Sequence, residues 1–302
     1  MRLFKQPSIR RPFIGLLISI LALGCYWQEA FQSAGQSQSE SDLERQWENA
    51  YRVRNGVIRK ETLYNTQHLF EHYQSRTTLF AESMAPLSVR WSLLWRWMGD
   101  AAWFHRNADR DSLRTRYLTD RFQETVINEQ ALYLDLAQIV QEFATAMELN
   151  AAAYFSGAMQ SEAMSEFREQ WRDQLQEEIR ELAGQLNQIV VEGKAFNRKV
   201  TGLMAADLLL ETSIYAALAI SMFVPLKVAV PILLTAGAVW FVKQQMSPEI
   251  SAYHRAAEGE ALRAVMELQE KVMHGDEKTP GLMVILKRAQ IQFEEAVLAH
   301  GY

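Results

Sequence analysis

Two histidines and a glutamate lie within one turn of a predicted helix, in the stretch His68-Leu69-Phe70-Glu71-His72. Residues four apart share one face of a helix, so His68 and His72 can reach the same metal ion. A zinc ion held in this way, with Glu71 as base, would activate water for hydrolysis. A third ligand would have to come from downstream, and Glu142 or Glu148 could supply it.

The H-x-x-E-H spacing resembles the inverted motif of a class of zinc proteases, which implies zinc-dependent hydrolysis. The resemblance covers these five residues alone, and the proteases that carry the motif have mixed α/β domains and are generally larger. The alternative, which we favour, is two ordinary surface histidines on an amphipathic helix. The sequence has no glycine-rich phosphate loop, and its single cysteine leaves no Cys–His pair. We therefore expect a non-enzymatic protein without metal or cofactor.

Composition and hydrophobic spacing predict an all-α fold. Only seven prolines occur in 302 residues, and helix-favouring residues dominate. One helix is predicted from residue 42 to about 85, where Pro86 ends or kinks it. Apolar residues then recur every three or four positions over 112–150 and over 161–203, as in two long amphipathic helices. These features predict an elongated antiparallel bundle with a coiled-coil-like body, residues 42–202, whose last helix runs directly into the apolar stretch that follows.

Half of the eight tryptophans lie within thirteen residues of this body, namely Trp91, Trp95, Trp97 and Trp103. Trp91 and Trp95 are four apart and share a helix face. Indole rings favour the headgroup level of a bilayer, so the group can form an interfacial belt. The alternative, which we favour, is that the rings pack in the core. Gly99 and Asp100 predict a turn within this segment.

The most apolar stretch is 203–243, where Lys227 is the only charge between Glu211 and Lys243. Prolines interrupt helices, so two arms and a turn are predicted around Pro225 and Pro231. The arms cover about 203–223 and 228–242. The second arm has 15 residues before Lys243, about 22 Å at helical rise, which falls short of a ~30 Å bilayer core unless the flanking lysines extend outwards.

Two interpretations of this stretch remain open. The arms form either a membrane-inserted hairpin, which we favour, or the apolar centre of a soluble bundle. Asp207 and Glu211 are four apart and share one face of the first arm. Inside a membrane such a pair is a candidate functional site. The alternative, which we favour, is that both carboxylates form a polar collar at the membrane surface.

After this stretch, residues 247–302 predict two further helices. Ser247-Pro248 and Thr279-Pro280 are typical helix starts, and residues 274–281 predict a turn between them. We expect an antiparallel helical hairpin here.

Residues 1–25 combine basic residues with an apolar run that ends at Leu21-Ala22-Leu23-Gly24-Cys25. This is the layout of a secretory signal. Its end resembles the lipobox of bacterial lipoproteins, which implies lipidation of Cys25. The departure from that pattern is Ala22, where leucine is commoner. An uncleaved anchor and plain cleavage are the alternatives. Residues 26–41 predict a flexible tether, and in a bacterium each alternative places the bulk of the chain outside the cytoplasm, in the cell envelope.

These features predict an envelope-anchored helical scaffold that binds membrane lipid and a helical protein partner or a second copy of itself. The formal net charge of −5 gives no basic surface for nucleic acid. A membrane-inserting or pore-forming protein is the second hypothesis, because long helices followed by one late apolar hairpin resemble the layout of helical pore-forming toxins such as the haemolysin BL-like group. The resemblance is architectural, so no residue roles carry over. A zinc hydrolase at His68, Glu71 and His72 is the third hypothesis.

Overall fold

The computed structural model describes residues 40–102, 113–193, 196, 198–246 and 248–301. The predicted all-α class is confirmed, since these residues form helices and, within the same ranges, show no strand beyond an isolated bridge between Gly275 and Pro280. The chain divides into two compact units, Met1–Ala50 and Tyr51–Tyr302. Every helix contact described below lies within the second unit.

The first predicted helix is two helices, α2 (Glu40–Ser75) and α3 (Thr77–Ser83). The hydroxyl groups of Ser75 and Thr77 donate hydrogen bonds of 2.6 and 2.7 Å to backbone carbonyls three residues earlier. Such local bonds compete with the helix ladder, and the break falls at Arg76.

The next helix, α4 (Leu87–Ala102), begins after Pro86. The Pro86 carbonyl accepts hydrogen bonds from the N–H groups of Val89 and Arg90 at 3.0 and 3.1 Å. Proline therefore ends the preceding helix and opens this one. The predicted turn at residues 99–100 is wrong, because α4 continues through both.

The single helix predicted over 112–150 is also two, α5 (Leu113–Thr125) and α6 (Glu129–Tyr154). Asn128 separates them: its backbone is extended and its side chain accepts a 2.8 Å hydrogen bond from the N–H of Ala131. This is an N-cap, which satisfies a free N–H group at the start of α6. The predicted apolar stripe is nevertheless buried, at Leu118, Phe122, Val126, Leu136, Val140, Phe143 and Met147.

A short turn, α7 (Ser156–Met159), leads into α8 (Glu162–Gly184). The prediction that α8 continues without interruption to residue 203 is wrong. The chain tightens into the 3-10 turn η1 (Gln185–Gln188), and Gly193 then has a φ of 63°, a conformation that glycine adopts at little cost. Because α9 (Arg198–Ser221) starts afresh after this turn, the body helix and the apolar arm are not one continuous rod.

The predicted apolar hairpin consists of α9 and α10 (Leu226–Met246). The carbonyl of Pro225 accepts hydrogen bonds from the N–H groups of Val228 and Ala229 at 2.8 and 3.0 Å, and so begins α10 two residues earlier than expected. Pro231 lies inside the helix and does not end it. At 21 residues α10 is about 31 Å long, the thickness of a bilayer core.

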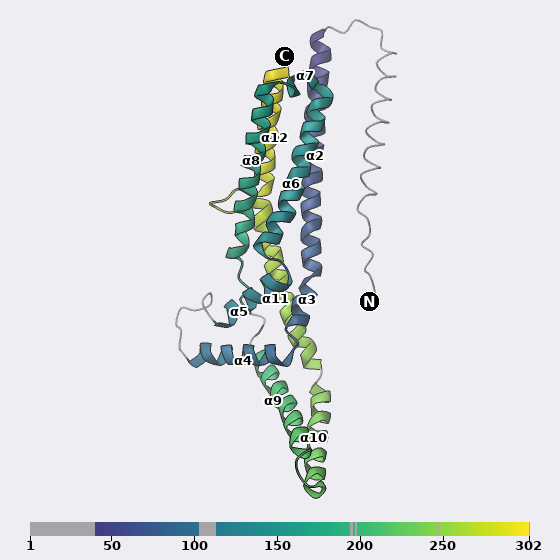
Figure 1. Cartoon of the computed structure of the whole chain (residues 1–302), viewed down its shortest axis with the longest axis vertical. Coiled ribbons are helices and arrows are strands. Elements are labelled where there is room, and N and C mark those ends of the chain that lie inside the picture. Colours follow the sequence, from purple (N-terminus) through teal and green to yellow (C-terminus); the bar gives the residue numbers. More distant parts are fainter. Residues whose placement is uncertain (1–39, 103–112, 194–195, 197, 247, 302) are drawn as a thin grey trace, which may run out of the picture. The chain divides into compact units, whose positions relative to one another are not determined.

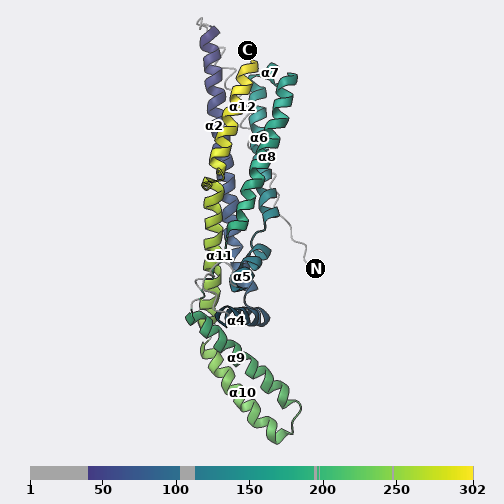
Figure 2. The same ribbon diagram turned by 90° about the vertical axis from the view of Figure 1, so that its left-hand side faces the viewer.

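Helices α11 (Pro248–His274) and α12 (Leu282–Gly301) follow each other in one direction, whereas the sequence predicts an antiparallel pair (Figures 1 and 2). Their contacts with α2 show this. Asn55 binds Glu294 at 3.1 Å, and Gln74 binds Gln269 at 3.1 Å. These partners are nineteen residues apart on α2 and twenty-five apart on α11–α12, and the seven residues 275–281 between the two helices account for this difference of six.

The segment 275–281 is thus an excursion that returns to its starting point. Gly275 and Gly281 lie so close that a Cβ atom on Gly275 would be 2.3 Å from the backbone nitrogen of Gly281. The φ of Gly275 is 81°, so glycine meets both the steric and the conformational demand. Since the excursion closes on itself, α12 continues along the line of α11.

Four helical elements run side by side in the second unit: the part of α2 from Tyr51 onwards, α6, α8 and the α11–α12 pair (Figures 1 and 2). Their shared core contains Trp171, whose ring lies 4.7 Å from that of Phe293 and whose Nε1 donates a 3.2 Å hydrogen bond to the carbonyl of Ala289. A buried tryptophan with its N–H satisfied supplies large apolar area without a polar penalty. This packing stabilises the helical body from which α9 and α10 extend.

The turn at Gly193 yields a test of the fold. A Cβ atom at this position would lie 2.8 Å from Cδ1 of Leu118, and the positive φ is unfavourable for alanine. We expect Gly193→Ala to destabilise the protein by about 1–3 kcal/mol, measured by chemical denaturation followed by circular dichroism.

Gly184→Ala is the matched control, because Gly184 is helical and a Cβ there meets no atom within 4 Å. This change should be neutral or stabilise by up to about 1 kcal/mol. Equal effects of the two substitutions would show that the chain has no left-handed turn at Gly193.

Candidate functional site

The hydrophobic surface of the α9–α10 hairpin is the most unusual feature of the described residues. Both helices are long and apolar enough to cross a membrane, and only 17% and 11% of their most apolar stretches are buried. A core helix of the same composition would be mostly buried. The alternative of an apolar bundle centre is therefore not what the fold shows, because the hairpin lies beyond the four-element core (Figure 1).

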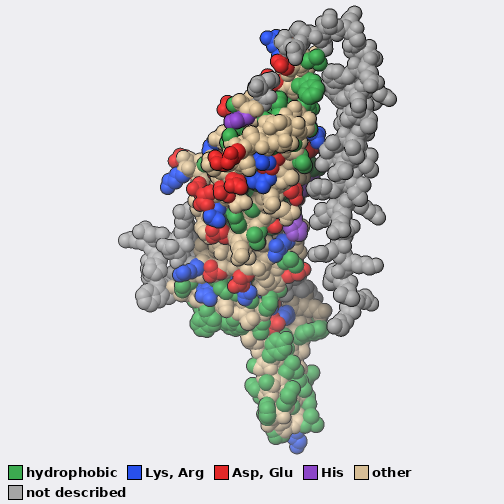
Figure 3. Space-filling model, turned by 45° about the horizontal axis from the view of Figure 1, so that its top comes forward, with side chains coloured by type: hydrophobic (Ala, Val, Ile, Leu, Met, Phe, Trp, Pro, Cys, Tyr) green, Lys and Arg blue, Asp and Glu red, His purple; other side chains and the backbone are tan. Residues whose placement is uncertain are grey.

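Half of the large hydrophobic side chains that are exposed in the described residues belong to this hairpin. Phe223, in the turn, is 88% exposed. Figure 3 shows these side chains covering the visible face of the hairpin, in contrast to the mixed charges of the body. The exposed large hydrophobic side chains of the hairpin are fourteen in number, namely Leu209, Tyr215, Leu218, Ile220, Met222, Phe223, Leu226, Val228, Val230, Leu233, Leu234, Trp240, Phe241 and Val242.

The two arms pack against each other through small residues. Ala229 and Ala236 are each 5% exposed, and they lie seven apart on one face of α10. Small side chains at a helix–helix contact let the backbones approach closely, which is how helices associate where no hydrophobic effect drives them together. The large side chains are left to point outwards.

Four hydroxyl groups of the hairpin are satisfied within their own helices. Thr212, Ser213 and Ser221 donate to carbonyls three or four residues earlier at 2.6–2.7 Å, and Thr235 does so at 2.9 Å. A bilayer core offers no water as a partner, so polar groups there must be paired internally. The hairpin meets this condition at each of these four residues.

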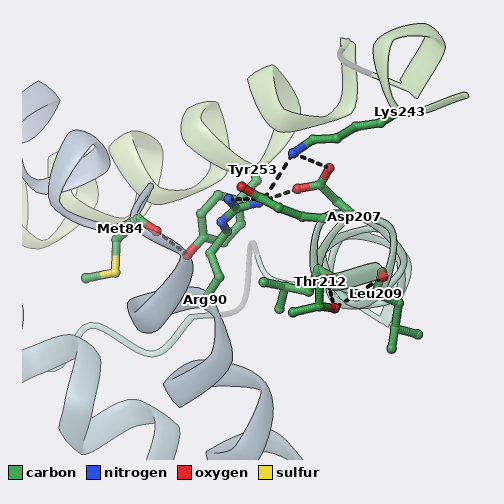
Figure 4. A network of polar contacts seen from close by, with 9 residues as sticks. Met84, Arg90, Asp207, Leu209, Thr212, Lys243 and Tyr253 are labelled. Carbon is green, nitrogen blue, oxygen red and sulfur yellow. Dashed lines mark hydrogen bonds and ion pairs between the residues drawn. The ribbon is translucent and has the colours of Figure 1, made fainter. Parts of the chain in front are cut away.

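Four charged residues meet at the base of the hairpin, and we call them the basal charge cluster: Arg90 from α4, Asp207 and Glu211 from α9, and Lys243 from α10 (Figure 4). The guanidinium of Arg90 binds the carboxylate of Asp207 and, at 2.9 Å, that of Glu211. Nζ of Lys243 lies 3.0 Å from Glu211 and 3.9 Å from Asp207. All four side chains are largely buried, and their charges balance.

Tyr253 of α11 closes the cluster from the side of the body (Figure 4). Its hydroxyl donates a 3.4 Å hydrogen bond to the carbonyl of Met84, and burial raises the pKa of the phenol. Tyr253 is therefore neutral at physiological pH and adds no charge to the two cations and two carboxylates of the cluster.

The sequence pointed to three of the four cluster residues but not to the pairing. Asp207 and Glu211 share a helix face as predicted, and Lys243 marks the end of the apolar stretch. Arg90 was missed, although it is the only charge between Pro86 and Arg96 in a hydrophobic segment. A single charged residue in a hydrophobic segment indicates a buried charge, and a buried charge needs a partner of opposite charge. The other predicted hairpin residues, Pro225, Lys227 and Pro231, lie at or near the turn.

The histidine motif lies on α2 and forms no metal site in the described part of the chain. Nδ1 of His68 contacts Glu71 at 2.7 Å, with both side chains about half exposed. The nominated third ligand Glu148 is instead paired with Arg172 at 2.7 Å, and Glu142 accepts a hydrogen bond from Gln138 at 3.2 Å. No group of three potential ligands occurs among the residues that are described.

Cys25, the rest of the predicted signal and residues 26–39 of the predicted tether lie outside the described residues, as do Trp103 and Ser247, whereas residues 40 and 41 of the tether belong to α2. Comparison with models of known families, with curated proteins and with solved structures finds no match to the chain. The argument for function therefore rests on the hairpin and its base.

Removing Arg90 tests the basal charge cluster. Arg90→Met leaves two largely buried carboxylates that, among the described residues, keep Lys243 as their remaining cation, and breaking a buried pair of this kind typically costs about 3 kcal/mol or more. We expect a loss of that size in the free energy of unfolding, measured by chemical denaturation in detergent micelles.

Arg180→Met provides the comparison, because Arg180 pairs with Glu177 at 2.5 Å on the surface, where both side chains are more than 60% exposed. Its loss should cost below about 1 kcal/mol. If Arg90→Met costs no more than Arg180→Met, the basal charge cluster does not stabilise the fold.

The histidine motif gives a prediction about metal. We expect the purified protein to contain no stoichiometric zinc and its thermal unfolding to be unchanged by a chelator, because the described part of the chain offers His68 and His72 no third ligand. Elemental analysis and calorimetry measure the two quantities. Stoichiometric zinc that is lost in the variant His72→Ala would contradict this expectation.

Proposed function

We propose that the protein is a non-enzymatic, membrane-attached helical scaffold whose α9–α10 hairpin is embedded in a lipid bilayer. The observation that supports this most strongly is the uncovered apolar surface of the hairpin. Moving one large apolar side chain out of water is worth about 1.5–3 kcal/mol, so fourteen partly exposed ones supply on the order of 20 kcal/mol. Lipid provides this burial around the whole circumference of the hairpin.

The positions of the two lysines fit a bilayer. Lys227 is exposed near the turn, and Lys243 lies at the base. The two lysines are sixteen positions apart on the helix, about 24 Å, and their flexible stems can extend towards water at either side of a ~30 Å core. Lys227 would thus reach the far headgroups, while the basal charge cluster stays at the near surface.

The hairpin is better suited to embedding than to lining a pore. A pore-lining helix needs a polar face towards water, whereas large apolar side chains surround α9 and α10 beyond the basal charge cluster, and the hydroxyl groups are turned to their own backbones. We therefore place membrane insertion ahead of pore formation.

The body would then act as a scaffold in the cell envelope. Apolar side chains remain exposed on its outer helices, including Val53, Val57 and Tyr64 on α2. Their spacing of four and seven puts them on one helix face, which suits a helical partner or a second copy of the chain. The predicted N-terminal signal or lipid anchor at Cys25 supports the same location.

Thiol labelling tests the membrane insertion. Leu234 on the hairpin is 70% exposed and Leu149 on the body is 68% exposed, so Leu234→Cys and Leu149→Cys make a matched pair in a Cys25→Ser background. The protein is added to preformed vesicles of phosphatidylcholine and phosphatidylglycerol and treated with a membrane-impermeant maleimide. The reagent needs a thiolate in water, so we expect Leu149→Cys to react and Leu234→Cys to react only after denaturation.

The same two variants in denaturant, where both thiols should react, control for intrinsic reactivity. Equal labelling of both positions on vesicles would show that the hairpin is not embedded.

A further inference from the structure

Helix α4 runs crosswise to the hairpin, at the level of its base. In Figure 1 it lies across the direction of α9 and α10, and in Figure 2 it is seen nearly end-on while the hairpin descends beside it. α4 also contacts α9 directly. A helix placed in this way would lie parallel to the surface of any membrane that the hairpin enters.

One side of α4 is committed to the body. Val89 and Leu93 are buried, and the guanidinium of Arg96 lies 4.6 Å above the ring of Tyr117 in α5. Gly99 allows α5 to come close, since a Cβ there would be 3.5 Å from Cδ1 of Leu113. These contacts fix the rotation of α4 about its own axis.

The side that remains free carries Ser88, Trp91 and Trp95, which share a face at spacings of three and four. Trp95 is 64% exposed. The ring of Trp91, half-buried against the core, stacks on it at 6.5 Å between centroids. In Figure 3, hydrophobic side chains continue from the base of the hairpin onto the adjoining region that α4 occupies in Figure 1.

Arg90 links α4 to the base of the hairpin. It lies on α4 five residues before Trp95 and binds both carboxylates of α9. Because charges are costly inside a bilayer, the basal charge cluster would lie at the surface of a membrane that the hairpin enters. Trp95 would then lie at the headgroup level, where indole is most favourable.

We propose that α4 is an interfacial helix that binds the headgroup layer of a phospholipid bilayer, with Trp95 as its anchor and Trp91 stacked behind it. This proposal rests on the membrane insertion of the hairpin and adds the depth at which the body sits. A lipid surface is favoured over a protein partner because the exposed side of α4 adjoins the apolar surface of the hairpin, and an amphipathic helix lying on a membrane is stabilised by such a face.

Depth-dependent fluorescence quenching tests the proposal in the full chain. An environment-sensitive fluorophore is attached at Ser88→Cys, which keeps both tryptophans, and separately at Leu234→Cys and Leu149→Cys, all in the Cys25→Ser background. The probe membranes are phosphatidylcholine–phosphatidylglycerol vesicles with nitroxide lipids labelled either near the headgroup or near the end of the acyl chain. We expect the label at residue 88 to be quenched about twofold more by the shallow nitroxide than by the deep one.

The label at residue 234 should show the reverse preference, and the label at residue 149 should not be quenched. Adding Trp95→Ala to the Ser88→Cys variant should reduce the shallow quenching and leave residue 234 unchanged, because Trp95 is exposed and outside the core.

The outcomes separate the two proposals. Quenching at residue 234 without quenching at residue 88 would overturn the interfacial role of α4 and leave the embedded hairpin standing. Deep quenching at residue 88 equal to that at residue 234 would also overturn it. Quenching at neither position would overturn both proposals.

Discussion

The ion pairs that join Arg90 and Lys243 to Asp207 and Glu211 link the crosswise helix α4 to the base of the α9–α10 hairpin, whose two arms already pack against each other. Taking these charges out of water is costly, and the cost is offset only while all four remain together. The cluster thus fixes where the buried body ends and where the uncovered hairpin begins. Because Arg90 belongs to α4, the same pairs also set the height and direction of that helix.

The base of the hairpin is held by these ion pairs and by buried residues of α9, Met204 and Leu208, which pack in the core of the body. The turn at Gly193 separates α9 from α8, so the orientation of the hairpin is set by contacts around the basal charge cluster and not by a helix that continues from α8. Beyond the basal charge cluster, small residues such as Ala229 and Ala236 let the two arms pack closely. Four serine and threonine hydroxyl groups donate to carbonyls of their own helix. Most of the remaining exposed surface of the hairpin is formed by large apolar side chains, as our proposal of an embedded hairpin with α4 at the membrane surface requires.

Hydrophobic periodicity predicted the all-α class, the buried stripes of α6 and α8 and the position of the hairpin, because helical spacing reflects which face is buried. Periodicity did not predict helix breaks across which the apolar residues continue to face the core. Asn128 and the turn near Gly193 interrupt helices whose apolar residues stay on the core side. The collinear α11–α12 pair also escaped prediction, since residues 275–281 resemble a reversing turn. Arg90 was missed because its partners are 117 and 121 residues away.

The most direct test of the account is flotation of residues 40–302, which lack the predicted signal and Cys25, on liposomes. The account predicts that this fragment floats with the lipid and resists alkaline extraction, because the hairpin anchors it without the predicted signal. A fragment that stays folded and soluble in the dense fraction would contradict the account, and α9–α10 would then need a protein partner to cover it.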